Sequence, residues 1–122
     1  MDELSELERG IILGILMSEG HFGGDGRQAQ VTLKLHVRHE PLLRWMHDRI
    51  RWSKLYGPYH YDGRHFLQLM FRGESLRRVL VPMLAKLPWK GIDGHSYGRF
   101  RAMCERYGLL GDAEVVSPGS ST

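Results

Sequence analysis

The stretch from Gly10 to Gly20 reads GIILGILMSEG, an apolar run that ends at one carboxylate followed by glycine. Gly10, Gly14 and Ser18 recur every four residues, so a helix would place them in one stripe of minimal side chains. Each glycine inside a helix costs about 1 kcal/mol relative to alanine, and close approach of a second helix would offset that cost. The apolar run is shorter than the roughly 20 residues that a membrane span needs. The stretch therefore predicts a helix that packs tightly against another helix.

The helix is predicted from about residue 6 to residue 19. Ser5 and Glu8 have the spacing of a capping box, in which the serine side chain accepts from a helical amide and the glutamate reaches back. Gly20 suits the left-handed conformation that often closes a helix. We therefore expect Glu19 to project from a helix end, beside backbone carbonyls that favour a cation.

Apolar and polar residues alternate from Gln28 to Arg38, which predicts a strand with one buried face. Residues 23–26 are typical of a turn, so residues 21–22 would form a short partner strand in a hairpin. A helix is predicted over residues 40–51 from the spacing of its apolar residues. The polar face of the strand would carry Gln28, Gln30, Thr32, Lys34, His36 and Arg38.

A second hairpin is predicted around Asp62-Gly63, a dipeptide typical of a tight type I′ turn. Its strands would cover residues 55–61 and 64–72, and another helix would follow over residues 74–87. Pro88–Gly91 would break that helix, and a final helix would run from about residue 95 to residue 107. One face of the second hairpin would present Tyr59, Tyr61, Arg64, Phe66, Gln68, Met70 and Arg72.

These elements predict an α+β fold with a four-stranded antiparallel sheet that helices cover on one face. The length of 122 residues suits one domain. We expect residues 1–110 to form it and the small, polar residues 111–122 to form a flexible C-terminal tail. The uncovered sheet face is then the place to look for function.

Composition narrows the class of protein. Seventeen Lys and Arg residues against 14 Asp and Glu residues give a net charge of +3, which permits a polyanionic partner. The single Cys104 excludes an intrachain disulfide and a cysteine-based zinc site. Neither a secretory signal nor a membrane span is recognisable. We expect a protein of the cytoplasm, where it would associate with the nucleoid, or of an organelle, with no membrane partner and no secretion.

Residues 12–22 read ILGILMSEGHF, which resembles the motif of the LAGLIDADG homing endonucleases and related maturases, including the polar-aromatic pair after it. Gly14, Glu19 and Gly20 occupy diagnostic positions of the motif, whereas Met17 stands where the family usually has an acid. The family has the order αββαββα followed by C-terminal helices, which agrees with the elements predicted for residues 6–107. The resemblance implies that motif helices pair across a two-fold axis and that the sheet straddles DNA.

The activity implied by the resemblance is that of a homodimeric, sequence-specific double-strand DNA endonuclease, which cleaves a long, near-palindromic site with Mg²⁺. Phosphodiester hydrolysis needs an activated water and charge neutralisation, which a divalent metal on hard oxygen ligands supplies. Glu19, with the adjoining Gly20, would hold the metal. His39 and Lys90 match the positions of a water-positioning polar residue and of a basic residue in the family. The dimer interface would consist of Gly10, Leu13, Gly14, Met17 and Ser18.

Other interpretations stay open. A non-cleaving relative would bind DNA or RNA, as a domesticated DNA-binding protein or a splicing maturase. A structural dimerisation domain would instead use its polar sheet face to bind protein. His39 is explained equally well as a solvated or helix-capping histidine. Lys90 is also compatible with an ordinary loop lysine, in which case Lys86 is the alternative basic residue.

Overall fold

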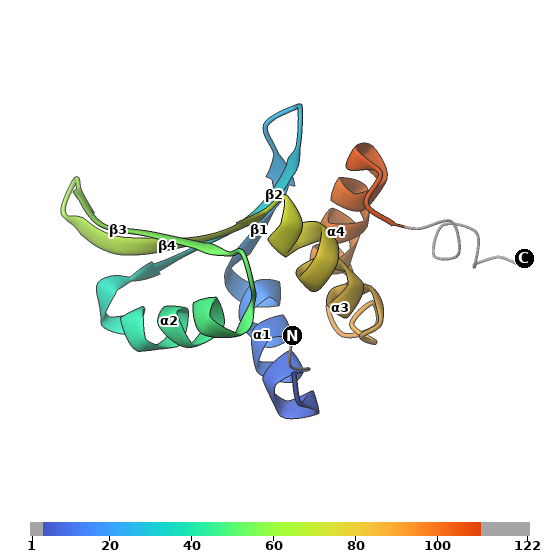
Figure 1. Ribbon diagram of the computed structural model, residues 1–122, viewed down its shortest axis with the longest axis horizontal. Helices are drawn as coiled ribbons and strands as arrows, with labels where there is room; N and C mark the ends of the chain where they lie inside the picture. The colour runs from blue at the N-terminus through green and yellow to red at the C-terminus, as the bar shows by residue number, and fades with distance from the viewer. Residues whose placement is uncertain (1–3, 111–122) are drawn as a thin grey trace, which may run out of the picture.

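A computed structural model describes residues 4–110, which form a four-stranded antiparallel sheet with helices packed against one of its faces (Figure 1). The strand order in the sheet is β1-β2-β4-β3, so the predicted α+β class and sheet are confirmed. The predicted tail, residues 111–122, lies outside the described residues. The elements are α1 (Glu6–Glu19), β1 (Gly20–Gly24), β2 (Ala29–His36), the 3-10 turn η1 (Val37–His39), α2 (Glu40–Arg49), β3 (Lys54–Tyr61), β4 (Arg64–Arg72), the π-helical segment η2 (Ser75–Leu80), α3 (Val81–Ala85) and α4 (Gly94–Tyr107).

Helix α1 begins at the predicted capping box and leads directly into β1. The Glu8 N–H donates to the Ser5 hydroxyl at 3.1 Å, and the Ser5 N–H donates to the Glu8 carboxylate at 2.8 Å. The prediction of a left-handed Gly20 is wrong, because its φ of −78° and ψ of 149° are extended. Glycine is needed there for space, since a Cβ would lie 2.7 Å from the Leu16 carbonyl oxygen. The chain therefore passes from helix to strand without a loop.

Strand β2 is shorter than predicted, because side chains turn the backbone at both of its ends. The Asp25 carboxylate accepts the N–H groups of Arg27 and Gln28, both at 2.8 Å, which places Gln28 in the turn before the strand. At the other end, Nδ1 of His36 accepts the Arg38 N–H at 3.0 Å, and the chain enters η1. Gln28 and Arg38 therefore lie outside the strand in which they were predicted.

The second hairpin agrees with prediction. Asp62 and Gly63 have φ values of 53° and 77°, as a type I′ turn requires at both central positions. Tyr59 pairs with Phe66, and Tyr61 pairs with Arg64. The aromatic residues of β3 therefore share a face with the even-numbered residues of β4.

The helix predicted over residues 74–87 has wider turns in its first half. The Val81 N–H donates to the carbonyl of Leu76, five residues earlier, rather than four. Pro82 follows, and proline lacks an N–H and clashes with the carbonyl four residues before it in a regular α-helix. The π-helical segment η2 gives the proline ring room ahead of the short helix α3.

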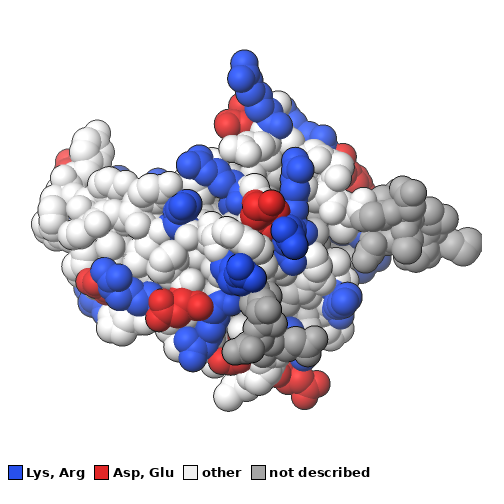
Figure 2. Space-filling model, viewed as in Figure 1, with Lys and Arg blue, Asp and Glu red and all other residues white. Residues whose placement is uncertain are grey.

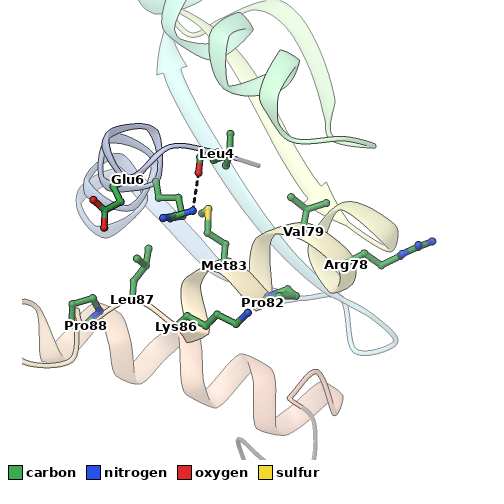
Figure 3. Close-up of a pocket in the computed structure, with 10 residues that line it drawn as sticks. Leu4, Glu6, Arg78, Val79, Pro82, Met83, Lys86, Leu87 and Pro88 are labelled. Carbon is green, nitrogen blue, oxygen red and sulfur yellow. Dashed lines mark hydrogen bonds between the residues drawn. The ribbon is translucent and has the colours of Figure 1, made fainter. Parts of the chain in front are cut away.

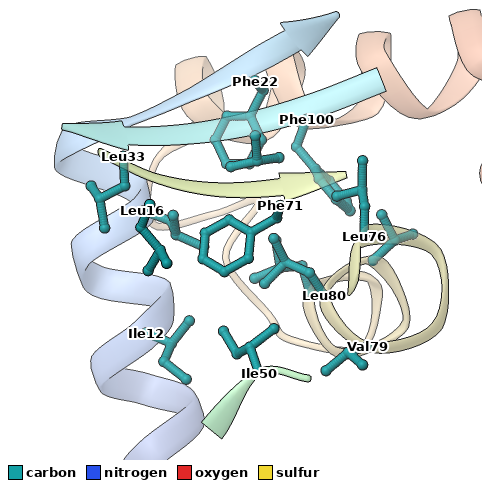
Figure 4. Close-up of a cluster of buried hydrophobic side chains, with 14 of the residues drawn as sticks. Ile12, Leu16, Phe22, Leu33, Ile50, Phe71, Leu76, Val79, Leu80 and Phe100 are labelled. Atoms are coloured by element: carbon teal, nitrogen blue, oxygen red, sulfur yellow. The ribbon is translucent and has the colours of Figure 1, made fainter. Parts of the chain in front are cut away.

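The hydrophobic core lies between the sheet and the helices (Figure 4). Trp89 is fully buried, its ring centroid lies 6.0 Å from that of Phe22 and 5.2 Å from that of Phe100, and its indole N–H donates to the Leu84 carbonyl at 2.9 Å. Burying each such side chain stabilises the fold by about 1.5–3 kcal/mol. This aromatic cluster holds α4 beneath β1. None of the described helices combines the length and hydropathy of a membrane-spanning segment.

Candidate nucleic-acid interface

The sheet face that points away from the helices carries polar, basic and aromatic side chains. Three cross-strand pairs form its centre, because β2 lies beside β4 with the even-numbered residues of both strands on this face. Their neighbours on the opposite face, among them Val31 and Phe71, are fully buried. The alternation therefore separates the core from an open surface, as the sequence predicted. The central pairs are Gln30 with Arg72, Thr32 with Met70, and Lys34 with Gln68.

A depression of about 490 Å³ lies in this face where α1 meets β1. It contains the single carboxylate of Glu19, which is exposed and forms no ion pair with any residue between 4 and 110. The acid of the motif is thus open to solvent beside amide and ammonium groups of the sheet. The depression is lined by Glu19, His21, Gln30, Thr32, Lys34, Gln68 and Met70.

The β3–β4 hairpin extends from the body of the molecule as an arm, and the tip of the β1–β2 hairpin projects in another direction, so the sheet is strongly curved (Figure 1). Tyr61 on this arm is 72% exposed, and the rings of Tyr59 and Phe66 lie 5.4 Å apart. The Lys34 ammonium lies 5.7 Å from the Phe66 ring centroid. Figure 2 shows Lys and Arg side chains over the middle of the molecule and the β1–β2 tip, whereas the side of the arm seen in this view is largely uncharged.

His36 lies where β2 leaves the sheet. Burial lowers its pKa most, and the charges of Arg38, His65 and His39 lower the pKa further. Its Nδ1 accepts hydrogen bonds from the backbone N–H and from Nε of Arg38, at 3.0 and 3.2 Å, which requires an unprotonated Nδ1. The neutral imidazole therefore orients Arg38 at the end of the open face.

Three residues of the open face were missed from the sequence. His21, on β1, pairs with Thr32 on β2. Lys54 and Tyr56, on β3, pair with Met70 and Gln68 on β4. The register of β3 shifts between Tyr56 and Tyr59. Because of this shift, counting residues back from the Asp62-Gly63 turn does not show which face Lys54 and Tyr56 occupy. The Gly57-Pro58 dipeptide is a sequence signal of such a strand irregularity.

The structure does not bring the other predicted catalytic residues to the depression of Glu19. His39 is exposed at the start of α2, and Lys90 is exposed in the loop between α3 and α4. Lys86 lines a different groove of about 550 Å³ between α1 and α3 on the helix side (Figure 3). Lys34 is the lysine that shares the depression with Glu19. The catalytic roles of His39 and Lys90 stay predictions.

The small-residue stripe of α1 is exposed. A Cβ added at Gly10 or Gly14 would meet nothing within 4 Å, and the Ser18 hydroxyl donates only to carbonyls of its own helix. Leu7 and Ile11 on the same side are 74% and 38% exposed. The other two predicted interface residues differ: Leu13 is 7% exposed in the core of its own chain, and Met17 is partly buried against that core.

The donor set around Glu19 limits the kind of metal it could hold. Between residues 4 and 110, no group of three His, Cys, Asp or Glu side chains is arranged to hold a metal ion. Mg²⁺ is commonly bound through one or two carboxylates together with substrate phosphates and water. Because Glu19 is exposed on a surface that suits a polyanion, it fits Mg²⁺ binding that phosphates and water complete. It does not fit a metal site enclosed by protein ligands alone.

Comparisons of the sequence with protein-family models and with curated proteins found no match.

Proposed function

We propose that two copies of this chain bind duplex DNA through their open sheet faces and cleave both strands at a long, near-palindromic site. The observation that carries the proposal is that Glu19 shares one depression with Gln30, Lys34 and Gln68. The depression thus combines glutamine amides that suit base edges, a lysine that suits phosphate and a carboxylate that suits a hard metal ion. The resemblance of residues 12–22 to the LAGLIDADG motif supports the same function.

The shape and chemistry of the face support DNA binding. A two-stranded ribbon fits the major groove of B-DNA, which is about 12 Å wide. Gln30 and Gln68 present amides that can pair with adenine, and the arginines of the face can pair with guanine. Lys34 neutralises phosphate, and the exposed aromatic residues of the arm add a contact surface that a solvated sheet face rarely has.

Cleavage depends on Glu19. When bound there, Mg²⁺ supplies an activated water and stabilises the leaving oxygen. The Glu19 carboxylate holds the ion at the sheet face, and Lys34 stabilises charge on the scissile phosphate. Because one carboxylate binds the ion weakly, a second Glu19 is needed near the first. The exposed Gly10, Gly14 and Ser18 stripe allows two α1 helices to approach closely enough to provide it.

A second candidate is a non-cleaving protein that binds DNA or RNA through the same face. It is favoured by the composition of the depression, where Glu19 is the only acidic residue from the described part of the chain and where neither His39 nor Lys90 contributes. Met17, in place of the acid that the family usually has, points in the same direction.

Incubation with a pooled duplex library and Mg²⁺ separates these candidates. The endonuclease should release cut products, and Glu19→Gln should abolish cutting while DNA binding persists. Glu74→Gln is the matched control, because Glu74 is also exposed but does not line the depression. Binding without cutting in the wild-type protein supports the second candidate. A protein with no salt-dependent affinity for DNA or RNA contradicts both, since phosphate contacts impose a steep salt dependence.

A further inference from the structure

A second hollow lies beside the open sheet face. A cleft of about 340 Å³ separates the β1 edge of the sheet from α4. Its strand side is formed by His21, Phe22 and the two glycines Gly23 and Gly24, which have no side chains, and Arg99 and Arg106 lie on its helix side. Among residues 4–110, those that line it include no Asp or Glu. The cleft therefore carries positive charge on its helix side, and the two glycines leave backbone groups accessible on its strand side.

Helix α4 is fastened to its surroundings next to this cleft. The Tyr107 hydroxyl accepts the backbone N–H of Gly26 at 3.1 Å, which ties the end of α4 to the β1–β2 tip. A Cβ at Gly24 would overlap the Tyr107 ring and would lie 2.6 Å from the Gln28 carbonyl oxygen. The spacing between the strand edge and the arginines is thus set by specific contacts.

Two arginines of the cleft have no acidic partner. Arg99 and Arg106 are both exposed, and neither forms an ion pair with any residue between 4 and 110. Arg101 on the same helix does have such a partner, because Glu105 lies 3.9 Å from its guanidinium. Arg99 and Arg106 are two turns apart, so about 10 Å separates them along the helix axis.

The cleft and the depression that holds Glu19 meet at His21, which lines both. One continuous surface therefore runs from the centre of the sheet, over the edge at β1, to α4. Lys34 lies toward one end of this surface and Arg106 toward the other, so both ends carry a cation, with the Glu19 carboxylate between them.

We propose that the cleft between β1 and α4 holds the phosphate backbone of the nucleic acid bound on the sheet face. This inference rests on the proposed function, because it extends the same binding surface. Phosphates recur along each strand at intervals shorter than the roughly 10 Å between the two arginines, so each arginine can reach a phosphate of its own. Contacts of this kind position the protein on the nucleic acid and read no bases.

The test compares two double variants of equal charge. Arg99→Gln with Arg106→Gln removes the cleft cations, whereas Arg44→Gln with Arg77→Gln removes two exposed arginines that do not line the cleft. The dependence of log K on log salt should become shallower by about 2 in the cleft variant, at about 0.9 for each lost phosphate contact. Affinity should fall roughly tenfold, and by the same factor for every duplex sequence. Thermal unfolding monitors the fold of each variant.

Stepwise shortening of the duplex gives a second readout. Wild-type protein should lose affinity once the duplex no longer reaches the cleft, and the cleft variant should then bind as tightly as wild type. The inference is overturned if wild type binds DNA while the cleft and control variants show equal salt dependence, although the proposed function then survives. A wild-type protein that binds neither DNA nor RNA overturns both.

Discussion

The hydroxyl of Ser96, at the start of α4, donates a hydrogen bond to the backbone carbonyl of Met17 in the last turn of α1, with an O···O distance of 2.9 Å. The last carbonyls of a helix have no partner within the helix, so this contact satisfies one of them. Ser96 is 8% exposed, which keeps competing water away. The turn that carries Ser18 and Glu19 is thereby held against α4.

Replacing Ser96 tests this contact. Ser96→Ala leaves the Met17 carbonyl buried without its partner, which should lower the free energy of unfolding by about 1–3 kcal/mol. Urea denaturation measures the loss. Ser18→Ala is the control, because the Ser18 hydroxyl is exposed and contacts only its own helix. Equal effects of the two substitutions would show that the link between α4 and α1 contributes nothing.

Two substitutions of Gly14 test separately the stability of the single chain and its association into a dimer. Within one chain a Cβ at Gly14 meets open space, so Gly14→Ala should stabilise the monomeric fold by about 1 kcal/mol. Gly14→Leu should dissociate a dimer that is built on α1, as sedimentation would show. Gly98→Ala on α4 has equally open surroundings and should leave association unchanged. A wild-type protein that sediments as a monomer would contradict the two-site cleavage mechanism.

Gly24 is required by its contact with Tyr107. Because a Cβ there would overlap the tyrosine ring, Gly24→Ala should destabilise the protein by about 1–3 kcal/mol, as overpacking does. Gly23→Ala should cost less, since its Cβ would meet only the movable end of the His21 side chain at 3.1 Å. Chemical denaturation of both variants gives the comparison. A greater loss at Gly23 would argue against the described packing of α4.

Acid should weaken the cap of α4. One oxygen of the Asp93 carboxylate accepts the Ser96 N–H, and the other lies 3.1 Å from the Ser96 hydroxyl, whose single proton is shared with the Met17 carbonyl. The backbone hydrogen bond is the largest cause of a pKa of Asp93 below the usual value of 3.8. Because the folded pKa is the lower one, the carboxylate stabilises the fold above pH 3.8 and loses this effect as pH falls through the folded pKa.

Asp93→Asn isolates that effect, because asparagine is also a good N-cap but does not titrate. Wild type should be more stable than Asp93→Asn at neutral pH, and the difference should shrink below about pH 4. Urea denaturation at a series of pH values measures it. If the difference in stability between wild type and Asp93→Asn stays constant down to acid pH, Asp93 stabilises the fold through its geometry and not through its charge.

Local patterns in the sequence determined much of this fold. The Ser5 and Glu8 capping box, the Asp62-Gly63 turn and the alternation in β2 and β4 depend on residues close together in the chain, and each was confirmed. These patterns were sufficient to predict which side chains of β4 face away from the core.

The tertiary structure decided the features that depend on distant neighbours. Gly20 is required by the nearby Leu16 carbonyl and not by a left-handed turn, and the register shift in β3 brings Lys54 and Tyr56 to the open face. Gln68 and Met70 share the depression with Glu19 because β4, distant in sequence, pairs with β2, whereas Lys34 reaches it through the local β1–β2 hairpin. His39, predicted by counting along the chain, is instead the last residue of the turn η1, which leads out of the sheet.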